Sequence, residues 1–557
     1  MDDEFYMELI EEIIKSNTKD TATVKKIRRA LCRKYKANIF PSFIQILTHA
    51  NQKQYHALKF LISKPTRTIS GVAPLAIMSK PFPCPHGKCI FCPGGPDSYF
   101  GNIPQSYTGN EPAAMRGLRN NFDPYLQTYN RLEQYQLLNQ NLDKIELIIM
   151  GGTFPSYPKQ YQNNFIKFAL KAMNDYGEIF HKNEFNFQEF KDFFLLPCSI
   201  KDKNREKKII EKISKLKGKT SLETEKLRNE SSKIRCIALA IETRPDFCKK
   251  PEINTMLNQG CTRVELGVQT VYNDILKKSK RGHSVEDSIE ATRLMKDSFL
   301  KVGYHIMPGL LGSTKEKDIN IFKEIFTNED FKPDFLKIYP CMVMPGTELN
   351  ELYKKGKYEP LATKDAARII AEGKTCIPKY CRVQRVQRDI PSKFIVKGVD
   401  VTNLRQYVEK QMKQKCRCIR CSEPKNKGLG ATKLFRMDYN ASQGQEIFLS
   451  IEDDKGILAG FCRLRKPCLP FRKEITENSM GVRELHVYSP SLRIGRKDKS
   501  SIQHRGYGQL LMKEAEKIAK EDFDCKKLLV IAGIGVKEYF IKKLHYTKDG
   551  TYVSKKI

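Results

Sequence analysis

The 557-residue sequence contains no apolar run that approaches the length of a membrane span. A transmembrane helix needs roughly 18–20 predominantly apolar residues. The N-terminus, Met1–Phe5, is acidic and therefore lacks the basic segment that begins a secretory signal. We expect a soluble, cytoplasmic protein without a membrane partner. The length predicts more than one core, roughly two to four domains, and seventeen cysteines without a secretory signal indicate metal sites or reactive thiols rather than disulfides.

Acidic residues are scarce in the stretch Lys15–Lys64, where twelve basic residues accompany one acid, Asp20. The whole chain has 98 Lys and Arg against 64 Asp and Glu, a net charge of +34. A Lys-rich composition alone would spread the basic residues evenly, so this clustering predicts a polyanionic partner, which we interpret as nucleic acid. The densest block predicts a helix docked on the body through Val24, Ile27 and Leu31. Its candidate RNA-binding residues are Lys25, Lys26, Arg28 and Arg29.

Three cysteines, Cys84, Cys89 and Cys92, stand in the loop Lys80–Pro96. Three thiolates can hold three irons of a 4Fe–4S cluster and leave the fourth iron open, which is how radical enzymes chelate and cleave S-adenosylmethionine. The alternatives are a zinc knuckle, with His86 as a fourth ligand, and unrelated free thiols. Spacing alone does not separate these alternatives.

Six short, apolar, β-rich runs follow residue 70, and longer helical patterns such as Gln160–Asp175 and Ser284–Phe299 separate them. This cadence predicts parallel βα units in an open sheet or a partial (β/α)6 barrel, whose active site lies at the carboxyl ends of the strands. The charged stretch Lys201–Lys233 is interpreted as a solvated helical insertion. The predicted strands are Ala73–Ser79, Lys144–Met150, Cys236–Thr243, Arg263–Thr270, Val302–Pro308 and Phe335–Pro340.

Four of these strands end in residues suited to a ligand. Gly151 and Gly152 let the backbone approach a ligand, and Glu242–Asp246 places an acid and a guanidinium at the same rim. Glu265–Thr270 and His305–Gly312 repeat the pattern. These strand ends are expected to lie beside the loop that carries Cys84, Cys89 and Cys92. Together they favour a radical S-adenosylmethionine site over a zinc site for these three cysteines.

A second cysteine cluster, Cys416, Cys418 and Cys421, places three thiols within six residues. We interpret it as a structural zinc site that lacks a local fourth ligand. The candidates for that ligand are Cys341, Cys376 and Cys381, of which Cys341 is preferred because it would staple the linker to the barrel.

The last hundred or so residues predict a separate α+β unit, with a glycine-containing turn, Gln503–Gly508, between a strand and the helix Leu510–Lys520. Glycines at a helix start free backbone N–H groups to bind a pyrophosphate. Together with the later segment Gly533–Phe540, this order favours an acetyltransferase that holds acetyl-CoA. The predicted strands are Glu446–Ile451, Ile457–Arg465, Gly481–Tyr488 and Lys527–Ile531.

The chain resembles the catalytic subunits of Elongator, in the stand-alone form found in archaea and some bacteria. The cysteine spacing, x4 then x2, departs from most radical S-adenosylmethionine enzymes and is similar to the archaeal variant. Phe540 stands where relatives have a second tyrosine near the thioester, and its side chain cannot donate a hydrogen bond. The role of these tyrosines is therefore assigned to Tyr539 alone. The motifs that carry the resemblance span nearly the whole chain: Ser70–Pro74, Cys92–Asp97, Gln105–Gly109, Glu111–Pro112, Gly151–Phe154, Glu242–Asp246, Arg385–Pro391, Arg483–Val487 and Gln503–Gly508.

The resemblance implies a basic helical tRNA-binding region (residues 1–68), a radical S-adenosylmethionine barrel (69–390), a zinc-binding linker (391–425) and an acetyltransferase domain of the GNAT type (426–557). It implies modification of the wobble uridine of tRNA to 5-carboxymethyluridine. The cluster would reduce S-adenosylmethionine, the resulting radical would take hydrogen from the methyl group of acetyl-CoA, the carbon radical would add to uridine C5, and the thioester would be hydrolysed.

The resemblance also implies roles for single residues. Cys84, Cys89 and Cys92 would hold the cluster, and Gly151, Gly152, Glu242 and Arg244 would position S-adenosylmethionine. Gln503, Arg505, Gly506 and Gly508 would hold the coenzyme A pyrophosphate, with Tyr539 near the thioester. Arg382, Arg385 and Arg388 would line the edge of a cleft for the anticodon loop.

Two rival functions stay open. One is a protein lysine acetyltransferase with a structural cluster, in which His486 or Glu484 would act as the base. The other is a non-catalytic tRNA-binding scaffold. The sequence leaves the electron donor unidentified and a homodimer undecided.

Overall fold

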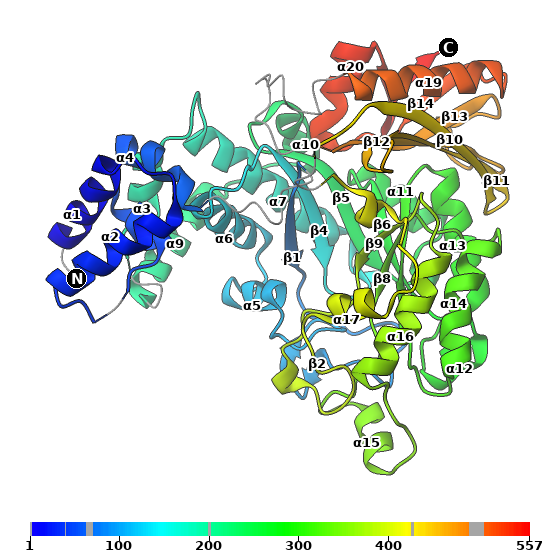
Figure 1. Cartoon of the computed structure of the whole chain (residues 1–557). Helices are drawn as coiled ribbons and strands as arrows, with labels where there is room; N and C mark the ends of the chain where they lie inside the picture. Colours follow the sequence, from blue (N-terminus) through cyan, green and yellow to red (C-terminus); the bar gives the residue numbers. More distant parts are fainter. Residues whose placement is uncertain (1–2, 39, 63–70, 199–201, 425–427, 489–505) are drawn as a thin grey trace.

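The computed structural model describes residues 3–38, 40–62, 71–198, 202–424, 428–488 and 506–557. Its centre is a seven-stranded sheet in the order β1-β4-β5-β6-β7-β8-β9, in which every neighbouring pair is parallel. With helices between the strands, this sheet curls into an open half-barrel (Figure 1). The strands are β1 (Ala73–Met78), β4 (Lys144–Met150), β5 (Arg235–Thr243), β6 (Arg263–Gln269), β7 (Lys301–Ile306), β8 (Phe335–Ile338) and β9 (Arg382–Arg385).

The six predicted strands are all present. The sheet also contains a seventh strand, β9, which was not predicted. The first strands are recognisable because parallel strands are covered on both faces and read as apolar runs. β9 has the sequence Arg-Val-Gln-Arg, and polar side chains at three of its four positions concealed it.

Helices of the half-barrel surround the sheet, and several begin at residues typical of helix starts. Asp123 caps the N-terminus of α6 through the backbone N–H groups of Tyr125 and Leu126, and Ser284 forms a capping box with Asp287 at α13. The helices are α5 (Pro112–Arg119), α6 (Pro124–Leu137), α7 (Lys159–Phe180), α11 (Lys250–Asn258), α12 (Asn273–Lys278), α13 (Val285–Asp297), α14 (Lys315–Thr327), α15 (Glu348–Lys354) and α16 (Thr363–Gly373).

Smaller elements accompany the half-barrel. The charged insertion is helical, as predicted, and a short hairpin follows the cysteine loop. The insertion holds α9 (Lys203–Leu216) and α10 (Leu222–Ser231), preceded by α8 (Phe187–Phe193); the hairpin is β2 (Gly95–Ser98) and β3 (Gly101–Ile103); the segment after β9 holds α17 (Leu404–Gln411) and α18 (Ile419–Ser422).

Four helices form an N-terminal unit at one end of the molecule: α1 (Asp3–Lys15), α2 (Thr21–Lys34), α3 (Phe43–His49) and α4 (Gln52–Leu58) (Figure 1). The basic helix is α2, which buries Val24 and Leu31 and packs on α1. The unit contacts the body through α4, where the Tyr55 ring stacks on Phe187 of α8 with ring centroids 4.0 Å apart. The predicted basic helix is confirmed, but α4 rather than α2 makes this contact with the body.

The C-terminal unit is a second seven-stranded sheet, in the order β10-β11-β12-β13-β14-β16-β15. Only β13 and β14 run parallel, and α19 (Tyr507–Glu521) connects them along the chain. β10, β15 and β16 were not predicted. The strands are β10 (Thr432–Ala441), β11 (Gly444–Asp453), β12 (Leu458–Lys466), β13 (Ser479–Val487), β14 (Lys527–Val530), β15 (Thr547–Asp549) and β16 (Tyr552–Lys556); α20 (Lys537–Leu544) precedes β15.

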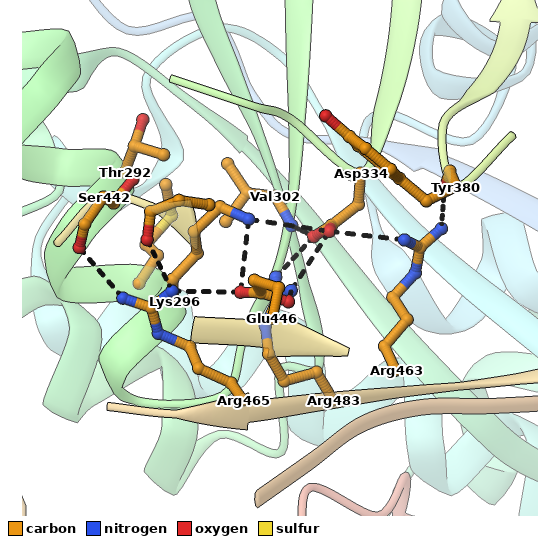
Figure 2. Close-up of polar contacts among 12 residues, drawn as sticks. Thr292, Lys296, Val302, Asp334, Tyr380, Ser442, Glu446, Arg463, Arg465 and Arg483 are labelled. Carbon is orange, nitrogen blue, oxygen red and sulfur yellow. Dashed lines mark hydrogen bonds and ion pairs between the residues drawn. The ribbon is translucent and has the colours of Figure 1, made fainter. Parts of the chain in front are cut away.

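A buried ionic network joins the two sheets (Figure 2). The Arg483 side chain, fully buried on β13, donates to Asp334 just before β8, with Nη1 3.1 Å from Oδ1, and to Glu446 of β11 at 2.7 Å. Lys296 of α13 lies 3.8 Å from Asp334 and 3.4 Å from Glu446. Although burial alone would raise it, the pKa of Asp334 is held well below its ordinary value by Arg483, Lys296 and Arg463.

Two further arginines extend this network. Arg465 of β12 donates to Asp297 of α13 at 2.6 Å and to Glu446 at 3.0 Å, and Arg463 donates to the carbonyl of Tyr380 at 2.5 Å. Asp334 precedes β8, so the C-terminal unit docks at the amino ends of the parallel strands. The carboxyl ends of these strands remain available for a site.

None of the described helices is both long and apolar enough to cross a membrane.

Candidate active site

A cavity of about 570 Å³ opens at the carboxyl ends of the parallel strands. All three cysteines of the first loop line it, together with residues from the ends of β4 to β9. The sequence expectation that the strand-end residues and the cysteine loop share one site is therefore reproduced.

The three thiols sit in a mixed polar and apolar setting. The Cys84 Sγ lies 3.8 Å from Thr153 Oγ1, and the Cys92 Sγ accepts from the Ser106 backbone N–H at 3.2 Å and donates to Gln105 Oε1 at 3.1 Å. Burial raises the pKa of Cys84 and raises that of Cys92 to about 11. A positively charged centre is needed to hold such thiols as thiolates.

The spacing of these thiols distinguishes the cysteine loop from a compact zinc site. Zinc–sulfur bonds of about 2.3 Å in a tetrahedron place the sulfurs roughly 3.8 Å apart. Among the described residues, two groups of potential ligand atoms lie within 4.8 Å of one another, and Cys84, Cys89 and Cys92 form neither of them. A wider set of three thiols lining a cavity fits an iron–sulfur cluster with one open iron.

The two glycines after β4 take different positions. Gly152 lines the cavity. Gly151 has φ +132°, and a Cβ there would lie 2.0 Å from Ser79 Oγ, so only glycine fits against β1 at this point. Gly151 therefore shapes the turn that presents Gly152.

Glu242 and Arg244 both line the cavity at the end of β5. Glu242 accepts from the Tyr107 hydroxyl at 2.8 Å and lies 3.3 Å from Lys337 Nζ. Arg244 pairs with Asp246 at 2.7 Å, while its Nη1 is buried without a partner in the described part of the chain. This unsatisfied donor is available to a ligand.

A chain of charges continues from Glu242 into the barrel. Lys337 contacts Glu265, and Glu265 lies 2.9 Å from His305 Nε2 and pairs with Arg263 at 2.8 Å. Burial opposes both charges. Lys337 and Arg263 nevertheless keep the pKa of Glu265 well below its ordinary value. The pKa of Lys337 is raised in turn by Glu265, Tyr339 and Glu242. The floor of the cavity is thus a balanced ionic network.

The rim of the cavity is basic. Arg385 and Arg388 line it as predicted. Arg382 does not, because its side chain turns toward the C-terminal unit and contacts Glu423 and, at 2.9 Å, the Tyr488 hydroxyl. Arg382 therefore does not lie at the edge of the cavity, where the prediction placed it beside Arg385 and Arg388. Five arginines that the sequence interpretation missed also line the cavity: Arg116, Arg131, Arg281, Arg405 and Arg420.

The basic helix α2 exposes Lys25, Lys26 and Arg29. Arg28 is buried instead, with 7% of its surface exposed. Its Nη1 donates to the carbonyl of Pro41 at 2.7 Å, and its guanidinium lies 3.8 Å from the centre of the Phe40 ring. The prediction that Arg28 binds RNA is therefore corrected, because the segment after α2 folds over this side chain.

The second cysteine cluster is compact. The Sγ atoms of Cys416, Cys418 and Cys421 lie within 4.8 Å of one another, and the Cys416 and Cys421 side chains lower the pKa of the Cys418 thiol. Cys341 is not part of this group. It packs beside Cys89 and Cys92 at the other cysteine site, so its prediction as the fourth zinc ligand is wrong.

A different cysteine adjoins the compact cluster. The backbone N–H of Ile419 donates to the Cys381 carbonyl at 3.0 Å. The pKa of the buried Cys381 thiol is raised mainly by burial and, next, by the charge of the Cys418 thiolate. The cluster therefore ties its segment to the start of β9.

Gly508, at the start of α19, lies beside Tyr539 of α20. A Cβ on Gly508 would lie 3.1 Å from the Tyr539 hydroxyl and 3.9 Å from Val487 Cγ2 at the end of β13. Tyr539 is partly exposed and Phe540 is buried in the core of this unit. Gly506 is exposed at the start of α19, whereas the candidates Gln503 and Arg505 lie outside the described residues.

Two residues of the site were missed although the sequence carries a signal for each. Lys337 is the single charged residue in the apolar strand Phe335–Ile338, and an isolated charge in a buried strand indicates a polar interior. Arg281 stands in a Lys-Arg-Gly-His run after α12 and donates to Cys89 Sγ at 3.3 Å. No local signal distinguishes the rim arginines.

Comparisons with known proteins agree with this arrangement. The sequence pattern of the ELP3 N-terminal domain matches residues 3–69, that of the Radical SAM superfamily matches 81–325, and that of the Radical_SAM C-terminal domain matches 333–414. None of these three ranges extends into the C-terminal unit.

Full-length relatives include that unit. A protein of Methanocaldococcus infernus called tRNA uridine(34) acetyltransferase is 49% identical, over 99% of this chain and 98% of its own. The human Elongator complex protein 3 is 37% identical over 96% of this chain and 93% of its own. A solved structure of the archaeal Methanocaldococcus infernus Elp3 with an N-terminal deletion is 46% identical, covers 88% of this chain and all of its own, and superposes with a TM-score of 0.70.

Proposed function

Since this chain belongs to the Elongator complex protein 3 family of tRNA uridine(34) acetyltransferases, we propose that it converts the wobble uridine of tRNA to 5-carboxymethyluridine with acetyl-CoA as the carbon source. The methyl carbon of acetyl-CoA becomes bonded to C5 of the uracil, each carbon loses one hydrogen, and water releases coenzyme A. The first hydrogen ends on 5′-deoxyadenosine. The second leaves as a proton while the uridine adduct gives up one electron, which would return to the iron–sulfur cluster and offset the electron spent on S-adenosylmethionine.

The observation that carries this proposal is that one cavity holds the cysteine loop, the strand-end polar residues and a basic rim. Cys84, Cys89 and Cys92 would hold a 4Fe–4S cluster, as the radical S-adenosylmethionine family implies. A cluster with an open iron supplies the electron that cleaves bound S-adenosylmethionine.

The chain's own residues orient the reactants. Gly152 gives the backbone close access to S-adenosylmethionine, and the unsatisfied Nη1 of Arg244 offers a donor to its carboxylate. Lys337, held between Glu242 and Glu265, provides a fixed positive charge in the cavity. Reaction within the cavity, rather than on the open surface, limits access of water to reactive carbon.

We assign acetyl-CoA to the C-terminal unit, which we interpret as a GNAT-type domain over residues 426–557. β13 and β14 run parallel and are joined through α19, whose N-terminus lies beside Tyr539. Backbone N–H groups at Gly506 and Gly508 are suited to the pyrophosphate. The Tyr539 hydroxyl is suited to the thioester.

Replacing Gly508 with valine should raise the Kd for acetyl-CoA at least about tenfold, or about 1.4 kcal/mol. The added side chain meets the Tyr539 hydroxyl and fills the turn. Isothermal titration measures this change. Gln509→Val is the matched control, because Gln509 is exposed on the same turn. An unchanged Kd in Gly508→Val would contradict the assignment.

tRNA is assigned to the basic rim and the N-terminal unit. The triple variant Lys25→Ala, Lys26→Ala, Arg29→Ala should bind tRNA more weakly and lower the slope of log K against log salt by about 2, if all three side chains contact phosphates. Anisotropy at several salt concentrations measures the slope. The control removes the same charge from exposed lysines of α9: Lys203→Ala, Lys207→Ala, Lys208→Ala. Equal slopes in both triples would contradict the assignment.

We propose that Cys416, Cys418 and Cys421 bind a structural zinc, because their Sγ atoms have the mutual spacing that a tetrahedral ion needs. The domain boundaries at residues 68, 390 and 425 stay predictions. So does the cytoplasmic location.

Neither base considered for the rival lysine acetyltransferase is suited to that role. The Glu484 carboxylate has no free oxygen, because one oxygen contacts Lys301 and the other accepts from Arg463 Nε at 2.8 Å. Burial lowers the pKa of His486 to about 4, so this ring is a weak base. Neither candidate favours amine acetylation.

The proposed function is tested by anaerobic reconstitution with iron and sulfide, followed by acetyl-CoA, S-adenosylmethionine, a reductant and tRNA. Mass spectrometry of the digested tRNA should show 5-carboxymethyluridine, dependent on all four additions. No modified nucleoside, with 5′-deoxyadenosine formed regardless of tRNA and acetyl-CoA, would refute it.

A further inference from the structure

Arg281 is a buried guanidinium that contacts one of the three candidate cluster ligands. Its Nη1 donates to Cys89 Sγ at 3.3 Å, and its Nη2 donates to the carbonyl of Gly267 at 2.8 Å. Only 6% of its surface is exposed. The two bonds use opposite nitrogens of the planar fork, so the guanidinium bridges the cysteine loop and strand β6.

The backbone around Arg281 is fixed against the cysteine loop. The N–H of Ile90 donates to the carbonyl of Ser279 at 3.3 Å. Gly282 has φ +68°, and a Cβ there would lie 2.6 Å from the Cβ of His86, so glycine is required for this approach. Arg281 is thus held in place by contacts on both sides and not merely by its own side-chain bonds.

The contact distinguishes Cys89 from the other two cysteines. In the described part of the chain, the hydrogen-bond partners of Cys84 and Cys92 are the neutral groups of Thr153, Gln105, Ser106 and Gly94. Cys89 lies 3.2 Å from the Nε2 of His86 in addition to its contact with Arg281. A permanent positive charge therefore acts directly on one ligand of three.

We propose that Arg281 is a positioning residue that raises the reduction potential of the cluster through Cys89. Reduction adds one negative charge to the cluster, and a cation at hydrogen-bond distance inside a low-dielectric cavity stabilises the reduced form more than the oxidised one. Hydrogen bonds to cluster sulfurs act in the same direction. Because Gly267 holds the other nitrogen, Arg281 keeps this position in both oxidation states.

This inference rests on the cluster assignment above, and its test is independent of turnover. The reconstituted full chain is titrated with a reductant of known potential, and the reduced cluster is counted by electron paramagnetic resonance. The variants are Arg281→Gln, Arg281→Met and Arg281→Lys. The control is Lys280→Gln, which removes the same charge from the neighbouring side chain, an exposed one paired with Glu348.

Both neutral variants should show a reduced-to-oxidised ratio at least about tenfold lower at a fixed solution potential, which corresponds to a negative shift of about 59 mV for one electron. Arg281→Lys retains the charge and should lie nearer to the unmodified protein. Lys280→Gln should match the unmodified protein.

Neutral variants with full iron content and an unchanged midpoint would overturn the inference. Failure of both neutral variants to bind iron would also overturn it, because Arg281 would then act in cluster assembly instead of tuning. Absence of a 4Fe–4S signal in the unmodified protein and in Lys280→Gln alike would mark a failure of the cluster assignment itself.

Discussion

The replacement of Cys89 with serine is expected to abolish formation of 5-carboxymethyluridine while tRNA affinity stays within about twofold. A serine hydroxyl is not a thiolate ligand for iron, so the cluster would lose one of three protein bonds. Cys89 lies on the cavity wall, apart from the exposed basic residues of α2. Iron content, nucleoside analysis and tRNA anisotropy on the same preparation measure the three quantities.

Cys468→Ser is the matched control for this prediction, because Cys468 is an exposed thiol of the C-terminal unit. It should keep full iron content and full product formation. Product formation by Cys89→Ser at the unmodified rate would show that the open-iron site lies elsewhere. If Cys89→Ser lost tRNA affinity together with product formation, the cysteine loop would shape the RNA-binding surface. The role of Cys89 would then be structural and not chemical.

The half-barrel was predictable because its strands are buried on both faces and read as apolar runs, such as Ile145–Met150. The glycines and charged residues at the strand ends were also predictable, because the residues that follow parallel strands meet at the same edge of the sheet. β9 was missed because its own sequence is polar. A strand was therefore predictable when its own residues were apolar enough to show that it is buried.

Contacts between distant segments were not predictable from local patterns. A helical projection of α2 places Arg28 beside exposed lysines, but cannot show that Phe40 returns to cover it. Cys341 follows β8 and Cys418 follows β9 in the sequence, yet Cys341 is buried in the apolar cluster that contains Cys89 and Cys92. Arg463 and Arg465 read as ordinary polar positions of a strand, and only the folded chain brings α13 to Arg465.

Replacing Asp334 with asparagine is expected to destabilise the association of the two sheets by about 3–5 kcal/mol, the range for removing one partner of a buried ion pair. Asp334 is fully buried and accepts from Arg483 and from the Val302 backbone N–H at 2.7 Å. An amide leaves Arg483 and Lys296 with Glu446 as their shared carboxylate, so the buried network lacks one negative charge. Calorimetry should show a lower onset of unfolding, and hydrogen exchange should show faster exchange along β13 than along β5.

Asp524→Asn is the control for this prediction, since Asp524 is a largely exposed carboxylate that pairs only with Lys526 in the described structure. Its effect should be within about 0.5 kcal/mol. Because Asp334 lies at the amino ends of the strands, the variant should still assemble its cluster and bind tRNA at low temperature, but form product more slowly as the acetyl-CoA unit loosens. If Asp334→Asn unfolds like the unmodified protein, the ionic network does not hold the two units together. The apolar contacts between β5 and the segment Ile534–Val536 would then be the main link.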